Sequence, residues 1–256
     1  MMGRLEMMGR LEMITGCNAL VTGGSSGIGA AIAEGLAAAG CAVTVLGRDR
    51  TRLTALAHRL DACALVADLS TAEGLSQAAD AAKGVDLLVN SAGCGWAGDL
   101  AAMAPTDIDA LIAVNLTAPL RLAQAALPGM RSRGRGHLVF ISSIATVGVG
   151  GEAVYAATKA GLRTFAASVR HEVAGEGIGV TTLLPGAVRT PFFEHRGLPY
   201  DRHFPRPLSP AKVATALLQA IERGEPEVFA PRWLTVAARV QGAVPELFHR
   251  LAQRFG

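Results

Sequence analysis

Residues 19–29 read ALVTGGSSGIG, a short apolar run, a glycine-rich turn and the start of an Ala-rich stretch that continues to about Ala39. This order predicts a strand, a tight loop and a helix. Gly23 permits the tight turn, Gly27 lets the backbone approach a pyrophosphate, and Gly29 allows close helix packing. The first N–H groups of the helix would face the anion. We therefore predict a dinucleotide-binding loop, with a glycine-rich turn that holds no ligand as the alternative.

Strand-like and helix-like runs alternate along the rest of the chain. Further strands are predicted at 42–46, 62–67, 85–89, 138–141 and 180–184, the last of these being the final strand. Helices are predicted at 105–114, 119–133 and 152–174, with Asn115 between the first two. Such alternation is typical of a parallel sheet with right-handed crossovers. The predicted fold class is α/β, a single Rossmann-type doubly wound parallel sheet with helices on both faces.

The length of 256 residues suits one large α/β domain better than two small ones. We assign residues 14–256 to a single dinucleotide-binding catalytic domain with a C-terminal helical extension from about residue 233. Residues 1–13 repeat the run MMGRLE and are excluded from the fold, as a disordered segment, a cloning remnant or the product of a misplaced start site. Hydrophobic residues make up 50% of the chain. They form no apolar stretch long enough to predict a transmembrane segment.

Charge and cysteine content exclude several classes of site. The net charge is +3, and the basic residues are scattered except for RSRGR at 131–135, which we interpret as a solvated helix end and not as a nucleic-acid patch. The four cysteines, Cys17, Cys41, Cys63 and Cys94, have no CxxC spacing. They are interpreted as small buried hydrophobic residues in a reducing cytoplasm. No metal site and no disulfide are predicted, and the expected location is cytoplasmic.

Residues 136–161, GHLVFISSIATVGVGGEAVYAATKAG, carry the predicted chemistry. A buried strand ends in Ser142 and Ser143, and a glycine-rich turn leads to a helix that carries Tyr155 and Lys159. Side chains four residues apart share a helix face, so the phenol and the ammonium can meet in front of the strand end. The cation would lower the pKa of the phenol from about 10 towards neutrality. Such a group could protonate a carbonyl oxygen or deprotonate a hydroxyl while a hydride moves elsewhere. An ordinary surface Tyr and Lys are the alternative.

The end of the second predicted strand indicates the cofactor. The adenosine ribose lies at this position in such folds, where an acidic residue would bind its 2′-hydroxyl. This chain has Gly47 instead, followed by Arg48, which could clamp a 2′-phosphate. NADP(H) is therefore favoured over NAD(H), and in the alternative Arg48 only covers a helix start. Asp68 and Asn90 also follow strands, where each could face the ligand or cap the next helix.

Six motifs occur in order: TGGSSGIG, NSAG at 90–93, Asn115, the tandem serines, YAATK at 155–159 and PGAVRT at 185–190. With these motifs, residues 17–230 resemble the classical short-chain dehydrogenase/reductase family. The resemblance implies Tyr155 as the catalytic acid/base, Lys159 as its electrostatic helper and ribose ligand, and Ser143 as the donor to the substrate oxygen. It also implies Asn115 as the organiser of a proton-relay water. The implied cofactor-binding residues are Gly23, Ser25, Ser26, Gly27, Ile28, Gly29, Arg48, Asp68, Leu69, Asn90, Ala92, Gly93, Tyr155, Lys159, Pro185, Gly186, Val188 and Thr190.

The chain departs from the family pattern at three places. The usual spacing before the tyrosine selects Ser142, whereas counting along the strand from Gly136 selects Ser143, which we favour. Ser91 stands where the family more commonly has Asn. The C-terminus lacks the TGxxxxVDGG-like ending of β-ketoacyl-carrier-protein reductases, which the central run otherwise resembles. In composition the tail instead resembles those of members that act on steroids, retinoids and other lipophilic carbonyls.

The tail also predicts an amphipathic helix. Its apolar stripe consists of Val244, Leu247, Phe248, Leu251 and Phe255. We expect the stripe to dock on the domain or on a second subunit, with a membrane surface as the alternative.

Residues 192–207, FFEHRGLPYDRHFPRP, are predicted to form a mobile lid over an apolar substrate beside Trp96. A subunit-packing loop is the alternative. The candidate apolar walls are Phe192, Phe193 and Tyr200. The candidate ligands for an anionic end group are Arg196, Arg202 and Arg206.

Together these features predict an oxidoreductase that transfers a hydride between NADP(H) and the carbonyl or hydroxyl group of a lipophilic small molecule. The alternatives are a β-ketoacyl-thioester reductase, a non-catalytic NADP(H)-binding sensor and a peripheral membrane protein. The expected partners are the small-molecule substrate and further copies of the chain, in a homodimer or homotetramer.

Overall fold

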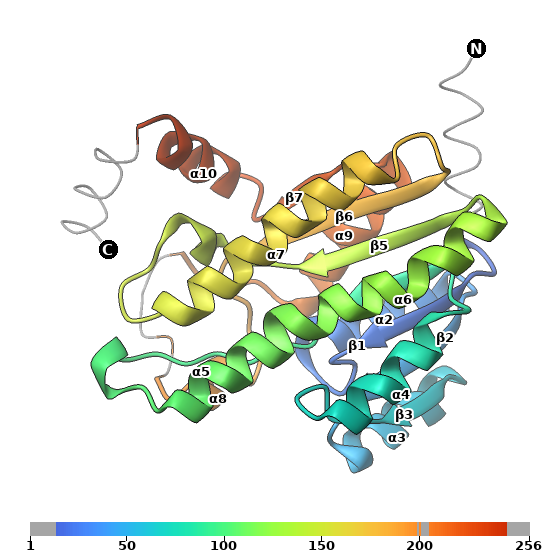
Figure 1. The fold of residues 1–256 in the computed structure, drawn as a ribbon, viewed down its shortest axis with the longest axis horizontal. Coiled ribbons are helices and arrows are strands. Elements are labelled where there is room, and N and C mark those ends of the chain that lie inside the picture. Colours follow the sequence, from blue (N-terminus) through green and yellow to red (C-terminus); the bar gives the residue numbers. More distant parts are fainter. Residues whose placement is uncertain (1–13, 199, 201–204, 245–256) are drawn as a thin grey trace.

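The computed structural model describes residues 14–198, 200 and 205–244. Its centre is a seven-stranded sheet in the order β3-β2-β1-β4-β5-β6-β7, with every neighbouring pair parallel (Figure 1). The strands are β1 (Asn18–Thr22), β2 (Ala42–Gly47), β3 (Cys63–Val66), β4 (Leu87–Asn90), β5 (Gly136–Ile141), β6 (Ile178–Pro185) and β7 (Glu227–Ala230). The predicted doubly wound parallel sheet is confirmed.

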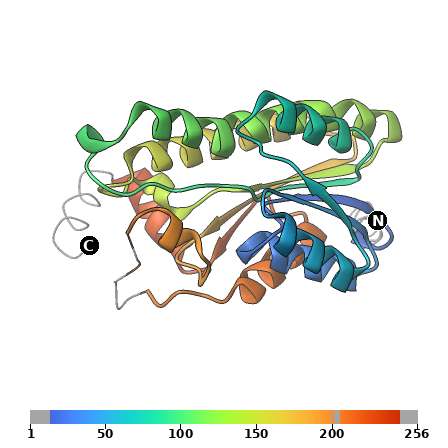
Figure 2. The same ribbon diagram turned by 90° about the horizontal axis from the view of Figure 1, so that it is seen from below.

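Helices cover both faces of this sheet, and the two helix layers are separated clearly in Figure 2. On one face α2 (Gly27–Ala38), α3 (Arg50–Leu60) and α9 (Pro210–Arg223) share a hydrophobic core that includes Ile32, Leu53 and Leu217. On the other face α4 (Ala72–Ala82), α6 (Ala118–Arg133) and α7 (Ala153–Glu172) share a second core that includes Leu122 and Leu162. Burial on both faces explains why the central strands β1, β4 and β5 are largely apolar without polar alternation.

The sheet has one strand more than the sequence predicts. We expected 180–184 to be the final strand, but β7 pairs in parallel with β6 from Thr182↔Glu227 to Pro185↔Ala230. The run EVFA is only four residues long and begins with a charged residue, so its strand character depends on pairing with β6. Beyond it lies α10 (Leu234–Ala243), and α8 (Phe192–His195) follows β6.

Asn115 does not separate two helices. Instead α5 (Pro105–Ile112), a wider π turn at Ala113–Thr117 and α6 form one continuous helical stretch, while short 3₁₀ turns occur at Leu100–Ala102 and Ile144–Val147. By length and composition this stretch, 105–133, is the one candidate for a membrane span among the described residues. Its Leu122, Ala126 and Met130 are fully buried in the core beside the sheet.

The predicted apolar stripe of the tail begins at Val244, which is half exposed beyond the end of α10. The other four residues of the stripe, and Arg202 of the predicted lid, lie outside the described residues.

Candidate active site

The end of β5 supplies two serines with different tasks. The Ser142 hydroxyl donates to the backbone oxygen of Lys159 at 2.8 Å, so it ties the strand to α7. The Ser143 hydroxyl accepts from the N–H of Ala145 at 3.0 Å, and the Ser143 side chain lies close enough to the Tyr155 phenol to lower its pKa. The structure therefore brings Ser143, and not Ser142, to the phenol.

Tyr155 and Lys159 lie on the first turns of α7 and are buried, with exposed fractions of 8% and 5%. The Lys159 ammonium donates to the Ile141 oxygen at 2.9 Å and lies 5.8 Å from the centre of the Tyr155 ring. Burial lowers the pKa of Lys159 to about 8, because the charged form is poorly solvated. The helix spacing thus brings the two groups together as the sequence indicates.

The direction of the phenol pKa differs from our expectation. Burial raises the pKa of Tyr155 above its ordinary value, although its hydrogen bond with Ser143 acts in the opposite direction. Among the neighbouring charges, the Glu152 carboxylate raises this pKa and the Arg196 guanidinium lowers it. The prediction of a lowered pKa was wrong for this state, because the loss of water around the phenol outweighs the Ser143 hydroxyl and the Arg196 guanidinium. The buried phenol of Tyr155 is therefore protonated at neutral pH in this state.

Asn115 is fully buried in the π turn. Its side-chain oxygen accepts from the Cys94 N–H at 2.9 Å, and its amide nitrogen donates to the Cys94 oxygen at 2.9 Å and to the Thr158 hydroxyl at 3.2 Å. A Cβ on Gly93 would lie 3.3 Å from the Asn115 oxygen and 3.4 Å from the Lys159 nitrogen. Asn115 therefore links the loop after β4 to α7, and its role with a relay water stays a prediction.

At Gly23 and Gly29 the glycine loop is packed too closely against other backbone atoms to admit a side chain. Gly23 has φ +66°, and a Cβ there would lie 2.8 Å from the Ala92 backbone. A Cβ on Gly29 would lie 2.3 Å from the Gly23 oxygen. The Thr22 hydroxyl accepts from the N–H groups of Ser91 and Ala92, both at 3.0 Å, and so joins the ends of β1 and β4.

Two observations fit a dinucleotide at this edge. Ser26, at the N-cap of α2, makes no capping bond through its side chain, so the first N–H groups of the helix are available to an anion. The buried side-chain oxygen of Asn90 has no hydrogen-bond partner among the described residues, while its nitrogen donates to the Val139 oxygen at 3.3 Å. A buried acceptor without a partner indicates a missing donor.

Arg48 lies at the end of β2 with 72% of its side chain exposed. Its guanidinium is 3.8 Å from the Asp68 carboxylate, which also accepts from the N–H and hydroxyl of Ser70 at 2.9 and 2.7 Å. Partial burial raises the pKa of Asp68, but the Ser70 bonds and Arg48 together bring the pKa below its usual value. Gly47 provides no side chain at the end of β2, and a Cβ there would lie 3.2 Å from the Ser25 hydroxyl. The site thus offers a cation where a 2′-phosphate would lie.

The remaining predicted cofactor residues lie around this edge. Thr190 approaches the glycine loop, since a Cβ on Gly27 would lie 2.9 Å from its methyl carbon. Val188 pairs with Leu208, which holds the segment after β6 in place. The N–H of Gly186 donates to the oxygen of Ala230, the last residue of β7, at 2.8 Å, so this N–H is already hydrogen-bonded within the sheet. Leu69 is a buried core residue at 5% exposure.

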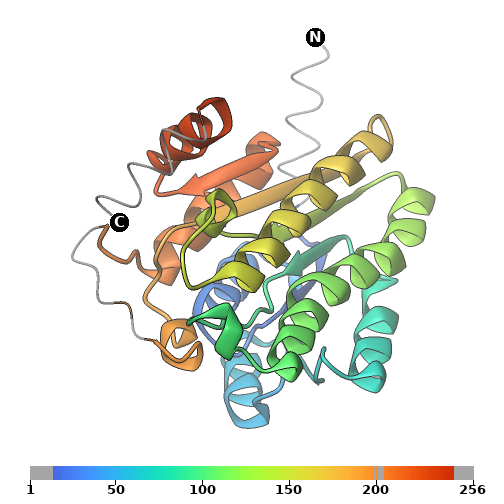
Figure 3. The ribbon, with the colours of Figure 1, turned by 60° about the vertical axis from the view of Figure 1, so that its left-hand side comes forward.

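Aromatic side chains of α8, which is an orange turn in Figure 3, and of the segment after it pack beside Tyr155. The rings of Phe192 and Tyr155 are 5.4 Å apart between centres, those of Phe192 and Phe193 5.6 Å, and those of Phe193 and Tyr200 5.1 Å. Trp96 belongs to the same apolar cluster as Tyr155 and Phe192. These are the aromatic side chains that the sequence indicates as walls.

Sequence reasoning missed the role of Glu152 and misassigned Arg196. The two form an ion pair with side-chain exposures of only 15% and 11%, and the Arg196 guanidinium also lies 4.7 Å from the Phe193 ring centre. Arg196 is therefore not free for an anionic end group, contrary to our expectation, because a carboxylate of this chain already binds it. Arg206 is exposed. The available signal was a single acidic residue at the start of the helix that carries Tyr155.

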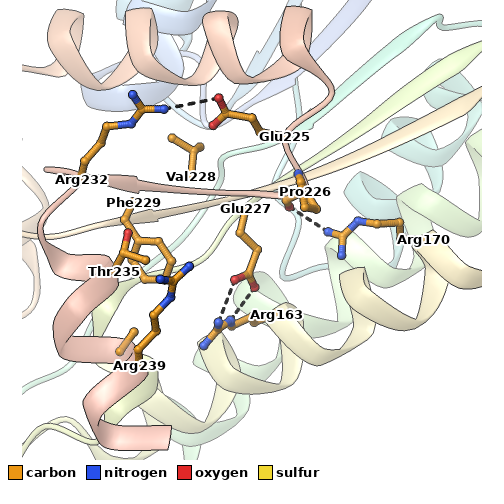
Figure 4. A pocket seen from close by; sticks show the side chains of 11 residues that line it. Arg163, Arg170, Glu225, Pro226, Glu227, Val228, Phe229, Arg232, Thr235 and Arg239 are labelled. Carbon is orange, nitrogen blue, oxygen red and sulfur yellow. Dashed lines mark hydrogen bonds and ion pairs between the residues drawn. The ribbon is translucent and has the colours of Figure 1, made fainter. Parts of the chain in front are cut away.

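A separate hollow of about 560 Å³ lies between α7, β7 and α10 (Figure 4). Arg163 makes two bonds to Glu227, at 2.6 and 2.8 Å, and Arg170 donates to the Pro226 oxygen at 2.8 Å. None of the predicted catalytic or cofactor residues lines this hollow. Its charged groups therefore belong to a different part of the molecule from Tyr155.

Comparison with known proteins gives matches along most of the chain. An uncharacterized oxidoreductase of Myxococcus xanthus is 36% identical, over 92% of this chain and 96% of that protein. The ketoacyl reductase HetN of Nostoc is 31% identical, over 85% and 79%.

Solved structures give the same result. A short-chain dehydrogenase from Sphingobium yanoikuyae in complex with NADPH has a TM-score of 0.81 at 31% identity, covering 89% of this chain and 94% of that one. The bulky-bulky ketone specific alcohol dehydrogenase from Comamonas testosteroni has a TM-score of 0.76 at 29% identity, covering 90% and 94%. A Burkholderia phymatum protein in complex with NAD has a TM-score of 0.82 at 23% identity, covers 91% and 95%, and supports the fold alone.

The family model for short chain dehydrogenases matches residues 17–199. This range contains the glycine loop, both serines, Tyr155 and Lys159. The chain belongs to the short-chain dehydrogenase/reductase family of oxidoreductases.

Proposed function

We propose that the protein is an NADP(H)-dependent carbonyl reductase or alcohol dehydrogenase in which Tyr155 is the general acid and base. The observation that carries this proposal is the buried cluster at the end of β5, where the Ser143 side chain approaches the Tyr155 phenol and the Lys159 ammonium lies 5.8 Å from the ring centre. A bound nicotinamide would supply or accept the hydride. The chain itself must then place and remove one proton at the substrate oxygen.

The proton step follows from the state of the phenol. Burial keeps Tyr155 protonated, so its hydroxyl can donate to a carbonyl oxygen that gains charge as reduction proceeds. The Ser143 hydroxyl can donate to the same oxygen and help to hold it beside the phenol. The Lys159 cation, fixed by the Ile141 oxygen, stabilises the phenolate that remains. In the direction of alcohol oxidation the phenolate accepts the proton.

NADP(H) is the cofactor that we favour. Arg48 is exposed, its guanidinium lies 3.8 Å from the Asp68 carboxylate, and the preceding residue, Gly47, has no side chain. A guanidinium binds a phosphate dianion with charge-assisted hydrogen bonds. The NADPH complex of the Sphingobium relative supports the same choice. NAD(H) is the alternative.

We propose that the substrate is lipophilic. The aromatic chain from Phe192 to Tyr200 and the Trp96 cluster present apolar surface over Tyr155. The relative from Comamonas, which is named for bulky ketones, supports this class. A β-ketoacyl thioester is the second candidate, supported by the likeness to HetN. Assay of a bulky aryl ketone against a β-ketoacyl thioester, each with NADPH, distinguishes the two.

Replacement of Tyr155 by Phe tests the proposed acid. The ring and its contact with Phe192 remain, so we expect kcat to fall by about 10³-fold or more while the NADPH dissociation constant changes less than about threefold. Steady-state kinetics and fluorescence titration measure the two quantities. Retention of more than a tenth of the activity would refute the role of Tyr155. Absence of turnover in the wild-type protein, together with tight NADPH binding, would instead favour the non-catalytic sensor.

The assignment of residues 14–256 to one domain, the cytoplasmic location and the homodimer or homotetramer stay predictions. Size-exclusion chromatography with light scattering measures the last of these.

A further inference from the structure

Cys17 and Cys41 lie side by side where two neighbouring strands begin. They directly precede β1 and β2, which pair in parallel from Asn18↔Ala42, and the N–H of Ala42 donates to the Cys17 oxygen at 2.8 Å. Neighbouring strands are about 4.8 Å apart, which is within the range of about 4.4–6.8 Å between the Cα atoms of a disulfide. The backbone alone therefore allows these two cysteines to be linked.

Their side chains point into the same core. Both thiols belong to the hydrophobic cluster beneath α2, with exposed fractions of 4% and 8%, and the two Sγ atoms are 2.6 Å apart. The Cys41 thiol can also donate to the Ile14 oxygen at 2.7 Å. Among the described residues no group of three or more His, Cys, Asp or Glu could hold a metal. The close approach is thus a pairing of two thiols and not part of a larger ligand set.

We propose that Cys17 and Cys41 are a reversible dithiol–disulfide pair that links the start of β1 to the start of β2. A low-molecular-weight disulfide such as oxidised glutathione is the oxidant. One protein thiolate attacks it, forming a mixed disulfide and releasing one glutathione thiolate, and the second protein thiolate then displaces the other. In total two protein thiols are oxidised, one disulfide is reduced to two thiols, and the two protons go to the released glutathione.

The two thiols differ in a way that suits this sequence of steps. The hydrogen bond from Cys17 lowers the pKa of Cys41, and the same bond raises the pKa of Cys17. The thiolate is the reactive form, and the contact between the two Sγ atoms lets the second thiol complete the link whichever one attacks first. Each thiol lies one residue from an exposed glycine, Gly16 and Gly40, so local opening of these turns can admit the oxidant.

The other two cysteines provide an internal comparison. Cys63 is exposed on β3, contrary to our expectation that all four would be buried, because β3 is the edge strand of the sheet. Cys94 lies near Asn115, and burial raises the pKa of its thiol. Neither makes a thiol–thiol contact within the described part of the chain.

The test uses the native full chain carrying Cys63→Ser and Cys94→Ser, so that only the proposed pair remains. This protein is incubated with oxidised glutathione, denatured, alkylated and mapped by mass spectrometry. Cys17→Ser and Cys41→Ser, each added separately, are the matched controls. We expect both thiols to be protected from alkylation, a mass loss of two hydrogens and a cross-linked peptide pair. Dithiothreitol should reverse all three.

Thermal unfolding gives the second measurement. Closing a loop between these residues restricts the unfolded chain, so the oxidised protein should melt about 5 °C or more above the reduced protein. Two free thiols after treatment of the protein that carries Cys63→Ser and Cys94→Ser, stable mono-glutathione adducts in place of the link, or linkage only in urea would each overturn the proposal. A lower melting temperature of the linked form would also overturn it.

Discussion

The surface of the site around the glycine loop consists of backbone atoms, whereas the surface around Tyr155 consists of side chains. Around Gly23 and Gly29 the surface is backbone, packed so closely that a Cβ would come within 2.3–2.8 Å of other backbone atoms. Around Tyr155 the surface consists of side chains, namely aromatic rings and the buried ion pair of Glu152 and Arg196. The backbone surface around the glycine loop would fit any ligand with the same phosphate geometry. The side-chain surface around Tyr155 can change its specificity when one of its residues is substituted. Recognition of the cofactor and selection of the substrate are thus physically separate.

The sharpest difference on the Tyr155 side lies between two adjacent serines. We expect Ser143→Ala to lower kcat by about 10²–10³-fold, because a donor to the developing oxyanion is lost. Ser142→Ala should leave kcat within about threefold and reduce the free energy of unfolding by about 1 kcal/mol, since it removes only the bond to the Lys159 oxygen. Kinetics and urea unfolding of both variants measure the contrast. The reverse pattern would restore Ser142 as the catalytic residue.

The ion pair of Glu152 and Arg196 connects the start of α7 to the apolar wall. Arg196→Met leaves the buried Glu152 carboxylate without its partner, so we expect a loss of about 3 kcal/mol in the free energy of unfolding. The KM for a bulky ketone should rise about tenfold, because Phe192 and Phe193 lose their support, while the NADPH dissociation constant stays the same. Arg206→Met, an exposed arginine of the same connection, is the control. An equal effect of both variants would show that only net charge matters.

Burial of the Lys159 cation beside the phenol lowers the stability of the folded protein without cofactor. Its pKa is about 8 in the folded protein, below the ordinary 10.5, so the folded state binds fewer protons than the unfolded state between these pH values. Stability therefore rises with pH across that window, and below pH 8 the full penalty is present. We expect Lys159→Met to raise the free energy of unfolding at neutral pH by about 2 kcal/mol without cofactor, allowing for the lost bond to the Ile141 oxygen.

The pH dependence separates this effect from simple repacking. The stabilisation by Lys159→Met should shrink as the pH approaches 10, whereas Lys212→Met, at an exposed lysine, should change little at any pH. Urea unfolding at several pH values measures both variants. A stabilisation that is independent of pH would contradict the assignment to burial of charge.

Arg48 should give the smallest effect, because it is exposed. We expect Arg48→Gln to weaken NADPH binding about tenfold, which corresponds to one lost charge-assisted bond, and to change NADH binding less than twofold. Fluorescence titration with each cofactor tests this. Equal affinities of wild type for NADPH and NADH would leave Arg48 as a surface residue at the start of α3.

Local patterns in the sequence determined much of the fold. The apolar run of β1, the glycines after it and the Ala-rich helix α2 predict their own structures, because each depends on near neighbours in the chain. The pairing of Tyr155 with Lys159 could also be predicted from the sequence, since helix geometry fixes the relation between residues four apart. The strand β7 could not be predicted from the sequence, because its four residues form a strand only through pairing with β6.

The tertiary structure decided the features that depend on distant parts of the chain. Adjacent residues of an extended strand point to opposite sides, so only the position of α7 shows that Ser143 faces Tyr155 while Ser142 faces the helix backbone. The direction of the Tyr155 pKa depends on burial by segments far away in sequence. The partner of Arg196 lies 44 residues away, and that of Cys17 lies 24 residues away. The sequence by itself determined which chemical groups are present, whereas packing decided which of them meet and how much water they keep.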